Sequence, residues 1–138
     1  MKKRIVLVIA VWMCSFLLFG SMDALAFCYT ATPNWSKSSL SNKVTFTATT
    51  IGGIEARGYY VFAYASLRTG SGGVTLATGG MKTSYVVAIA TSVKISSSAT
   101  YDNSQAKVGY AEYGISSDKD GVKKVEGMHI EMEYANIY

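Results

Sequence analysis

Three side chains of metal-binding type alternate near the carboxyl end of the chain, as His129, Glu131 and Glu133. In a strand, alternate residues point to one face, but each step of two residues advances about 6.6 Å. The ligands of one metal ion must converge to bonds of roughly 2.0 to 2.2 Å. We therefore expect a solvated strand face here, with no metal site and no cofactor.

A second acidic group, Asp118-Lys119-Asp120-Gly121, resembles part of a calcium-binding loop. If Gly121 is the glycine of the sharp turn, the first ligand falls on Ser116, and Gly127 replaces the bidentate glutamate that closes such a loop. These departures remove the strongest ligands. The segment is instead typical of a hairpin turn.

The sequence contains few side chains that could serve in nucleophilic or acid–base catalysis. Beyond residue 26 the chain has a single cysteine and a single histidine, near opposite ends. Ser71 lies between glycines, but Thr69 stands where a GxSxG motif needs its first glycine. Glu131 and Glu133 flank no evident cleft, which a glycosidase needs between its two carboxylates. We predict that the protein is not an enzyme.

The first 26 residues have the pattern of a secretory signal peptide. Lys2, Lys3 and Arg4 precede an apolar run over residues 5–19, and the segment closes on Ala24-Leu25-Ala26. The run is shorter than the roughly 20 residues that span a bilayer as a helix. We expect cleavage after Ala26 and a secreted, extracellular protein; a periplasmic or surface-anchored location is the alternative.

Cys28 would then be the second residue of the mature chain, with no other cysteine to pair with. A lone cysteine in a secreted chain indicates a free thiol or an intermolecular disulfide. Leu25-Ala26-Phe27-Cys28 also resembles a bacterial lipoprotein box, although Phe27 is large where that box has a small residue. Lipid attachment at Cys28 remains an alternative.

Removing 26 of the 138 residues leaves 112, the size of one domain. The leader takes three basic residues and one acidic residue with it, so 13 basic and 9 acidic residues become 10 and 8, a net charge of +2. No segment concentrates Lys and Arg, so we expect no nucleic-acid partner. No second apolar run is long enough to span a membrane.

Short segments of strand character follow one another from residue 28 onward, separated by Gly and Ser turns. We expect Pro33 to end the first strand, Gly79-Gly80 to form a turn and residues 96–98 to end the longest strand. On the last strand, Met128, Ile130, Met132 and Tyr134 are expected to point inward. The expected strands are 28–32, 44–50, 59–67, 74–78, 84–95, 106–115 and 122–134.

No segment after residue 26 has a sustained 3.6-residue apolar period. The sequence therefore predicts a single all-β domain over residues 27–138, built as a small antiparallel β-sandwich, with a small β-barrel as the alternative. Strand order does not follow from the pattern. Thr45, Thr47 and Thr49 make one threonine row; ice-binding proteins repeat such a row over many strands, and the sequence indicates only this one.

Aromatic residues are the main candidates for a binding surface. The chain beyond residue 26 keeps 10 Tyr, 3 Phe and 1 Trp, and tyrosine suits a surface that is wet when free and buried when bound. Tyr60, Phe62 and Tyr64 share one strand face, opposite Val61 and Leu67. They form a contact stripe if Val61 and Leu67 face the core; otherwise the row is itself buried.

These features favour a secreted, non-catalytic binding module at or outside the cell surface. Its partner would be a protein, a glycan or another ligand of the cell envelope. Two alternatives remain open: a bacteriocin-like or toxin-like effector, and a self-assembling extracellular subunit that pairs through exposed sheet edges.

Overall fold

The computed structural model describes residues 29–90 and 92–138. The predicted signal peptide and Cys28 lie outside the described residues. The described chain forms strands joined by short connections, with one 3-10 turn, η2. The elements are β1 (Tyr29–Lys37), β2 (Lys43–Gly52), η2 (Ile54–Ala56), β3 (Tyr60–Arg68), β4 (Thr75–Tyr85), β5 (Val93–Asp102), β6 (Val108–Ser116) and β7 (Lys124–Ala135).

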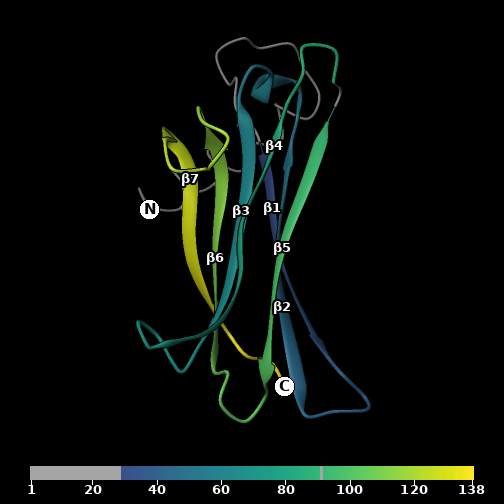
Figure 1. Cartoon of the computed structure of the whole chain (residues 1–138), viewed down its shortest axis with the longest axis vertical. Helices are drawn as coiled ribbons and strands as arrows, with labels where there is room; N and C mark the ends of the chain where they lie inside the picture. The colour runs from purple at the N-terminus through teal and green to yellow at the C-terminus, as the bar shows by residue number, and fades with distance from the viewer. Residues whose placement is uncertain (1–28, 91) are drawn as a thin grey trace, which may run out of the picture.

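The strands form two antiparallel sheets that pack face to face (Figure 1). One sheet has three strands in the order β1-β2-β5, and the other has four in the order β4-β3-β6-β7. The sheets do not close into one barrel. The predicted all-β antiparallel sandwich is confirmed, and the barrel alternative is wrong.

The main core lies between the two sheets, where period-two patterning points one side of each strand inward. Phe46 on β2 is its central aromatic residue, with its ring 4.7 Å from Trp35 and 5.7 Å from Tyr134. Gly109 on β6 lies directly against this ring, because a Cβ there would come within 2.6 Å of it. The glycine therefore lets β6 approach the opposite sheet.

A smaller apolar cluster closes one end of the sandwich. It is formed by the buried residues Ala56, Val61, Val86 and Ile115. They come from η2, β3, the β4–β5 connection and β6. This end is where β2 leads into η2, at the top of Figure 1.

The two sheets are in direct contact where β4 passes β5. A Cβ on Gly79 would lie 2.4 Å from the Ser98 carbonyl oxygen. The Ser97 hydroxyl donates to the Gly80 carbonyl at 2.7 Å and accepts from the Ala65 N–H at 3.2 Å. Gly79-Gly80 is therefore part of β4, and the prediction of a turn there is wrong.

The expected strand over residues 84–95 is also wrong. β4 ends at Tyr85 and β5 begins at Val93, so the apolar residues between them form a connection. Val86 exchanges backbone hydrogen bonds with Gly58 and Tyr59, both at 2.9 Å, and the Ala90 N–H donates to the Val87 carbonyl at 3.0 Å. The side chains of residues 84–95 alternate as in a strand. Backbone hydrogen bonds to Gly58 and Tyr59, in the β2–β3 connection, nevertheless hold the segment after Tyr85 as a turn.

Two other expected strand ends fall inside strands. Residues 96–98 lie within β5, and Pro33 lies within β1. β1 is at the edge of its sheet, a position at which a missing N–H is tolerated.

The predicted inward face of β7 is only partly buried. Met128 and Tyr134 pack against the two core clusters, but Ile130 and Met132 keep 43% and 46% of their surface exposed. Across residues 29–90 and 92–138, no helix is long and apolar enough to cross a membrane.

Candidate binding face

The orientation of β3 decides the status of the predicted aromatic row. Val61, Ala63, Ala65 and Leu67 are completely buried in the two core clusters. Tyr60, Phe62 and Tyr64 alternate with them and so lie on the outer side of the four-stranded sheet. The condition set by the sequence, that Val61 and Leu67 face the core, is met.

Phe62 is completely buried even though it lies on the outer side. Its cross-strand partner on β6 is Gly114, which leaves the ring room, and the Lys124 ammonium nitrogen is 5.9 Å from the ring centroid. The row is therefore not one continuous exposed stripe. Tyr60 and Tyr64 are half-buried on either side of it.

The β6–β7 connection, residues 117–123, reaches across this side of the sheet to β4. The Thr83 hydroxyl donates to the Lys119 carbonyl at 2.5 Å. Gly121 packs so closely on Met81 that a Cβ there would lie 2.8 Å from the Met81 Cγ. Thr83 is the β4 partner of Phe62, so this connection covers the phenyl ring.

The predicted hairpin turn over Asp118-Lys119-Asp120-Gly121 is confirmed as part of this connection. The Asp118 carboxylate accepts from the Lys123 N–H at 3.0 Å, and the Asp118 carbonyl accepts from the Ser116 hydroxyl at 2.7 Å. The acidic side chain thus organises its own turn.

On one side of Phe62, Tyr60 pairs with Tyr85 of β4. Their ring centroids are 5.1 Å apart at an interplanar angle of 57°, a geometry that aromatic pairs favour. Tyr85 keeps 48% of its surface exposed. Sequence reasoning placed Tyr85 on a long strand but could not find this pair, because strand order and register are not visible in a period-two pattern.

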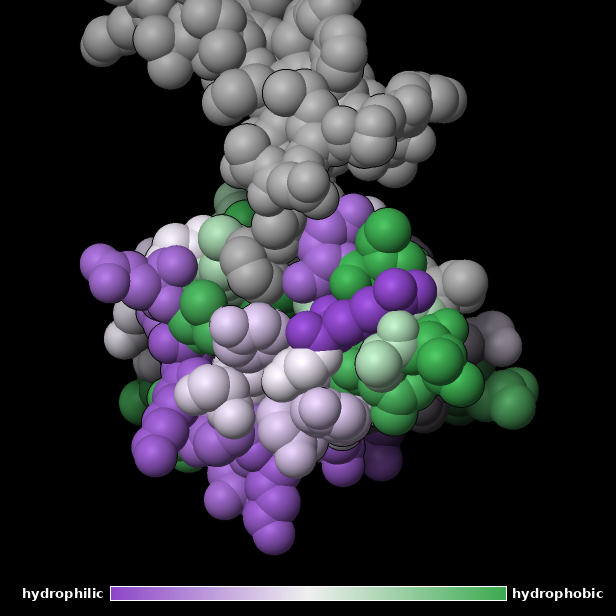
Figure 2. Space-filling model, turned by 90° about the horizontal axis from the view of Figure 1, so that it is seen from above, coloured by the Kyte–Doolittle hydropathy of each residue, from purple (hydrophilic) through white to green (hydrophobic). Residues whose placement is uncertain are grey.

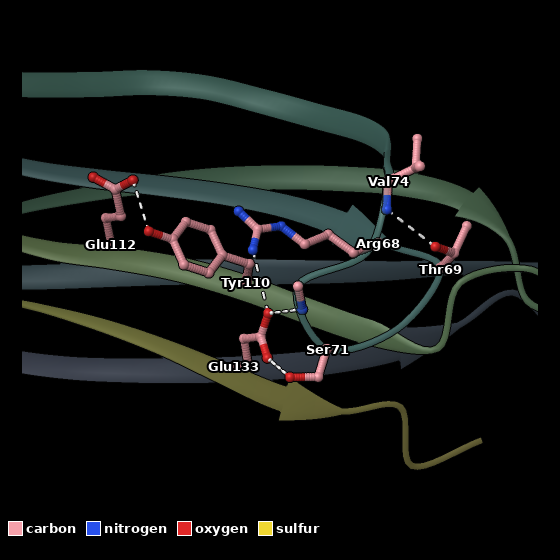
Figure 3. Close-up of polar contacts among 8 residues, drawn as sticks. Arg68, Thr69, Ser71, Val74, Tyr110, Glu112 and Glu133 are labelled. Atoms are coloured by element: carbon pink, nitrogen blue, oxygen red, sulfur yellow. Dashed lines mark hydrogen bonds and ion pairs between the residues drawn. The ribbon is translucent and has the colours of Figure 1, made fainter.

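On the other side, Tyr64 meets Tyr110 of β6 edge-on, with centroids 6.2 Å apart. Figure 3 shows Tyr110 with Arg68 and Glu112. The Arg68 guanidinium carbon lies 3.7 Å from the centroid of the Tyr110 ring, within the range of a cation–π contact. The Tyr110 hydroxyl donates to Glu112 at 3.0 Å. Burial and this carboxylate raise the pKa of Tyr110.

Glu133 ties the 69–74 connection to β7 (Figure 3). Its carboxylate accepts from the Gly72 N–H at 2.8 Å, from the Ser71 hydroxyl and from Arg68 Nη1 at 3.2 Å. The Gly72 N–H first, then Ser71 and Arg68, lower the pKa of Glu133. Ser71, considered above for nucleophilic chemistry, is therefore a structural donor.

Lys124 bridges two carboxylates on neighbouring strands. Its Nζ lies 2.5 Å from Glu112 and 3.2 Å from Glu131. Burial alone would lower the pKa of Lys124, but the hydrogen bonds to both glutamates raise it. The bond from Lys124 is the main cause that lowers the pKa of Glu131.

The expected solvated face of His129, Glu131 and Glu133 is therefore organised by ion pairs. Glu131 is bound by Lys124 and Glu133 by Arg68 and the 69–74 connection. Within the described part of the chain, no three His, Cys, Asp or Glu side chains gather as metal ligands. Sequence reasoning singled out neither Arg68, Lys124 nor Tyr110, whose partners come from other strands.

We call this outer side of the β4-β3-β6-β7 sheet the tyrosine face. Its aromatic members are Tyr60, Tyr64, Tyr85 and Tyr110. The charged groups around them are Arg68, Lys124, Glu112, Glu131 and Glu133.

The outer side of the three-stranded sheet, the hydroxyl face, has a different character. The threonine row of β2 is bonded to β5 through Thr45–Thr100 at 2.7 Å, Thr47–Ser98 at 2.7 Å and Thr49–Ser96 at 2.8 Å. On β1, Ser36, Asn34 and Thr32 lie opposite the same three threonines. Sequence analysis found one row; the structure places polar rows on three adjacent strands. The β2 hydroxyls are used within the sheet.

The chain matches no known protein family, and neither a curated protein nor a solved structure is significantly similar to it.

Proposed function

We propose that the protein is a secreted, non-catalytic binding module and that the tyrosine face is its recognition surface. The observation that carries this proposal is the pair of tyrosine clusters, Tyr60–Tyr85 and Tyr64–Tyr110, outside the core on one side of a four-stranded sheet. Large amphipathic side chains outside the core suit intermittent contact with a partner. The buried ring of Phe62 and the 117–123 connection lie between the two tyrosine clusters.

A neutral glycan is the ligand class that the face fits best. Arg68 and Lys124 are paired with Glu133, Glu112 and Glu131, so the face carries little net charge to attract an ionic ligand. It offers ring faces beside carboxylate and guanidinium groups. A neutral sugar presents the matching surfaces, an apolar C–H face and polar hydroxyls.

Two carboxylates of this face are poorly suited to general-acid catalysis. A general acid that works near neutral pH needs a raised pKa. Hydrogen bonds and ion pairs lower the pKa of both Glu131 and Glu133. Both groups therefore stay charged near neutral pH.

The test is a screen of the exported protein against an array of neutral oligosaccharides, repeated with the double variant Tyr60→Ala with Tyr64→Ala. Both side chains are half-buried and outside the core. We expect the double variant to fold and to lose most of its binding. The matched control is Thr47→Ala with Thr49→Ala on the hydroxyl face, which should bind like the wild type.

Loss of folding in the double tyrosine variant would contradict the proposal, because the aromatic row would then be structural. Equal loss of binding in both double variants would contradict it as well, because the effect would not be specific to the tyrosine face.

Self-assembly is the alternative with structural support. β7 lies at the edge of the four-stranded sheet, and its own residues Ile130 and Met132 are exposed. Exposed apolar edges can pair with a second chain. Sedimentation of the Cys28→Ser protein, which cannot form a covalent dimer, distinguishes the two functions, since only a self-assembling subunit forms larger species as its concentration rises. For the effector alternative, killing of neighbouring cells by the purified protein is the distinguishing observation.

A further inference from the structure

The β4–β5 connection exposes apolar side chains where connections are usually polar. Residues 86–90 read Val-Val-Ala-Ile-Ala. Val87 is 47% exposed and Ile89 is 88% exposed. Apolar groups gathered on a surface indicate an interaction site. We call residues 86–90 the apolar turn.

The apolar turn is fixed at both of its ends. Val86 is completely buried in the end cluster, and Ala90 packs against the same cluster. Arg57 donates to the Ala90 carbonyl through Nε at 2.9 Å and Nη2 at 2.8 Å. The residues between these anchors are thereby held outward.

A further exposed apolar side chain, outside the apolar turn, lies at the same end. Ile54 of η2 is 51% exposed, and the 53–59 connection is bonded to the turn through the Gly58 N–H and the Val86 carbonyl at 2.9 Å. Figure 2 looks onto this end and shows hydrophobic side chains gathered on one side of it.

The position of the amino end identifies the partner. Tyr29 pairs with Gly52, and Gly52 pairs with Val93, so the described chain starts at the end that carries the apolar turn. The 28 residues before Tyr29 include the apolar run 5–19. The inference rests on the predicted export: a leader that enters a membrane would hold this end of the domain next to the bilayer.

We propose that the apolar turn, together with Ile54, docks this end of the sandwich onto a lipid bilayer. Exposed apolar side chains can be buried at the boundary between headgroups and acyl chains, as the apolar faces of interfacial helices are. The contact is apolar rather than electrostatic, because the charges of Glu55 and Arg57, which flank Ala56 next to Ile54, are opposite in sign. Neutral lipid should therefore be sufficient.

The test uses the product that a bacterial host exports when it expresses residues 1–138, mixed with phosphatidylcholine vesicles and separated by flotation. We expect the wild type to float with the vesicles. Ile89→Asp should reduce the bound fraction about 10-fold or more, since it replaces an inserted apolar side chain by a charge. Position 89 is solvent-exposed in the free protein, so Ile89→Asp should not change the midpoint of urea unfolding.

The matched control is Leu40→Asp. Leu40 is 97% exposed and lies in the 38–42 connection, at the opposite end of the sandwich, so this variant should float like the wild type. Tyr64→Ala should float as well, which separates this inference from the proposed glycan binding. Failure of the wild type to float, or equal losses for Leu40→Asp and Ile89→Asp, would overturn the proposal.

If the exported chain keeps its leader, every variant floats and a local probe is needed. Ile89→Trp and Leu40→Trp are then compared in vesicles of phosphatidylcholine with brominated acyl chains, where the two native tryptophans contribute equally to both. Extra quenching is expected for the tryptophan at 89 only. Equal quenching at both positions, or none at either, would contradict docking through this end.

Discussion

Among single residues, Phe62 does most to shape the tyrosine face. It is a fully buried phenyl ring on the outer side of a sheet, with Lys124 and the 117–123 connection above it. Phe62→Ala should lower the free energy of unfolding by about 3 to 5 kcal/mol, because the ring leaves a cavity beneath that connection. Urea denaturation measures this loss. A change no larger than that of Tyr64→Ala would show that the ring is not covered in solution.

Glu133 gives the face a pH-dependent contribution to stability. Hydrogen bonds lower the pKa of Glu133 in the folded state below its ordinary value of 4.5. Its contribution is therefore complete above pH 4.5 and is lost as the pH falls through the lowered pKa. Glu133→Gln should be less stable than the wild type at neutral pH, and the difference should shrink under acid conditions.

Chemical denaturation of both proteins across a pH series measures this difference, with Glu126→Gln as the control on the same strand. A difference that stays constant down to strongly acid pH would contradict the linkage.

The side of β3 on which each residue lies could be predicted, because alternation alone separates Tyr60 and Tyr64 from Val61 and Leu67. The burial of Phe62 could not, because it depends on a connection more than fifty residues further along the chain. The same holds for Arg68, whose partners Tyr110 and Glu133 come from β6 and β7. Contacts between distant segments leave no local pattern.

Among the elements, the pairing of β2 with β5 is reinforced by its row of hydroxyl bonds. Thr47 and Ser98 are cross-strand partners whose hydroxyl oxygens are 2.7 Å apart. Cross-strand polar pairs contribute roughly 0.2 to 1 kcal/mol. A double-mutant cycle of Thr47→Ala and Ser98→Ala should give a coupling energy in this range, whereas Thr47 with Ser36, which are not cross-strand partners, should give almost none.

Equal coupling for both pairs would show that the hydroxyl bond adds nothing specific. Urea denaturation of the single and double variants supplies all of the required values.

Strands could be predicted where the alternation of apolar and polar side chains stops at a turn, as it does for β2 and β7. The segment 84–95 was not, because Tyr85, Val87 and Ile89 alternate like a strand across a turn. That turn is set by the backbone of Gly58 and Tyr59 and by the Arg57 guanidinium. A strand-like pattern on an exposed turn is a conflict between local sequence and structure, and such conflicts are expected at functional sites.

For the whole molecule, export is the prediction that the leader sequence carries. Ala24 and Ala26 occupy the positions that a signal peptidase reads, so intact mass should show a secreted product that begins at Phe27. A product that retains Met1, or one that begins at a lipid-modified Cys28, would contradict cleavage after Ala26.

Cys28→Ser should leave the melting temperature unchanged and remove any covalent dimer from a non-reducing gel.

The three surfaces described above lie on different sides of the sandwich. The tyrosine face and the hydroxyl face lie on opposite outer sides, and the apolar turn lies at the end where β1 begins. A domain docked through that end would present the tyrosine face sideways, free to contact surface glycans. Recognition and membrane contact would then use different residues.

Amide chemical-shift mapping by NMR, during titration with a neutral oligosaccharide selected on the array, tests the central claim most directly. The proposed function predicts that shifts concentrate on β3, β4 and β6 around Tyr60, Tyr64, Tyr85 and Tyr110, while the amides of β1, β2 and β5 stay unchanged. Shifts confined to the hydroxyl face, or the absence of any shift with every neutral oligosaccharide on the array, would contradict it.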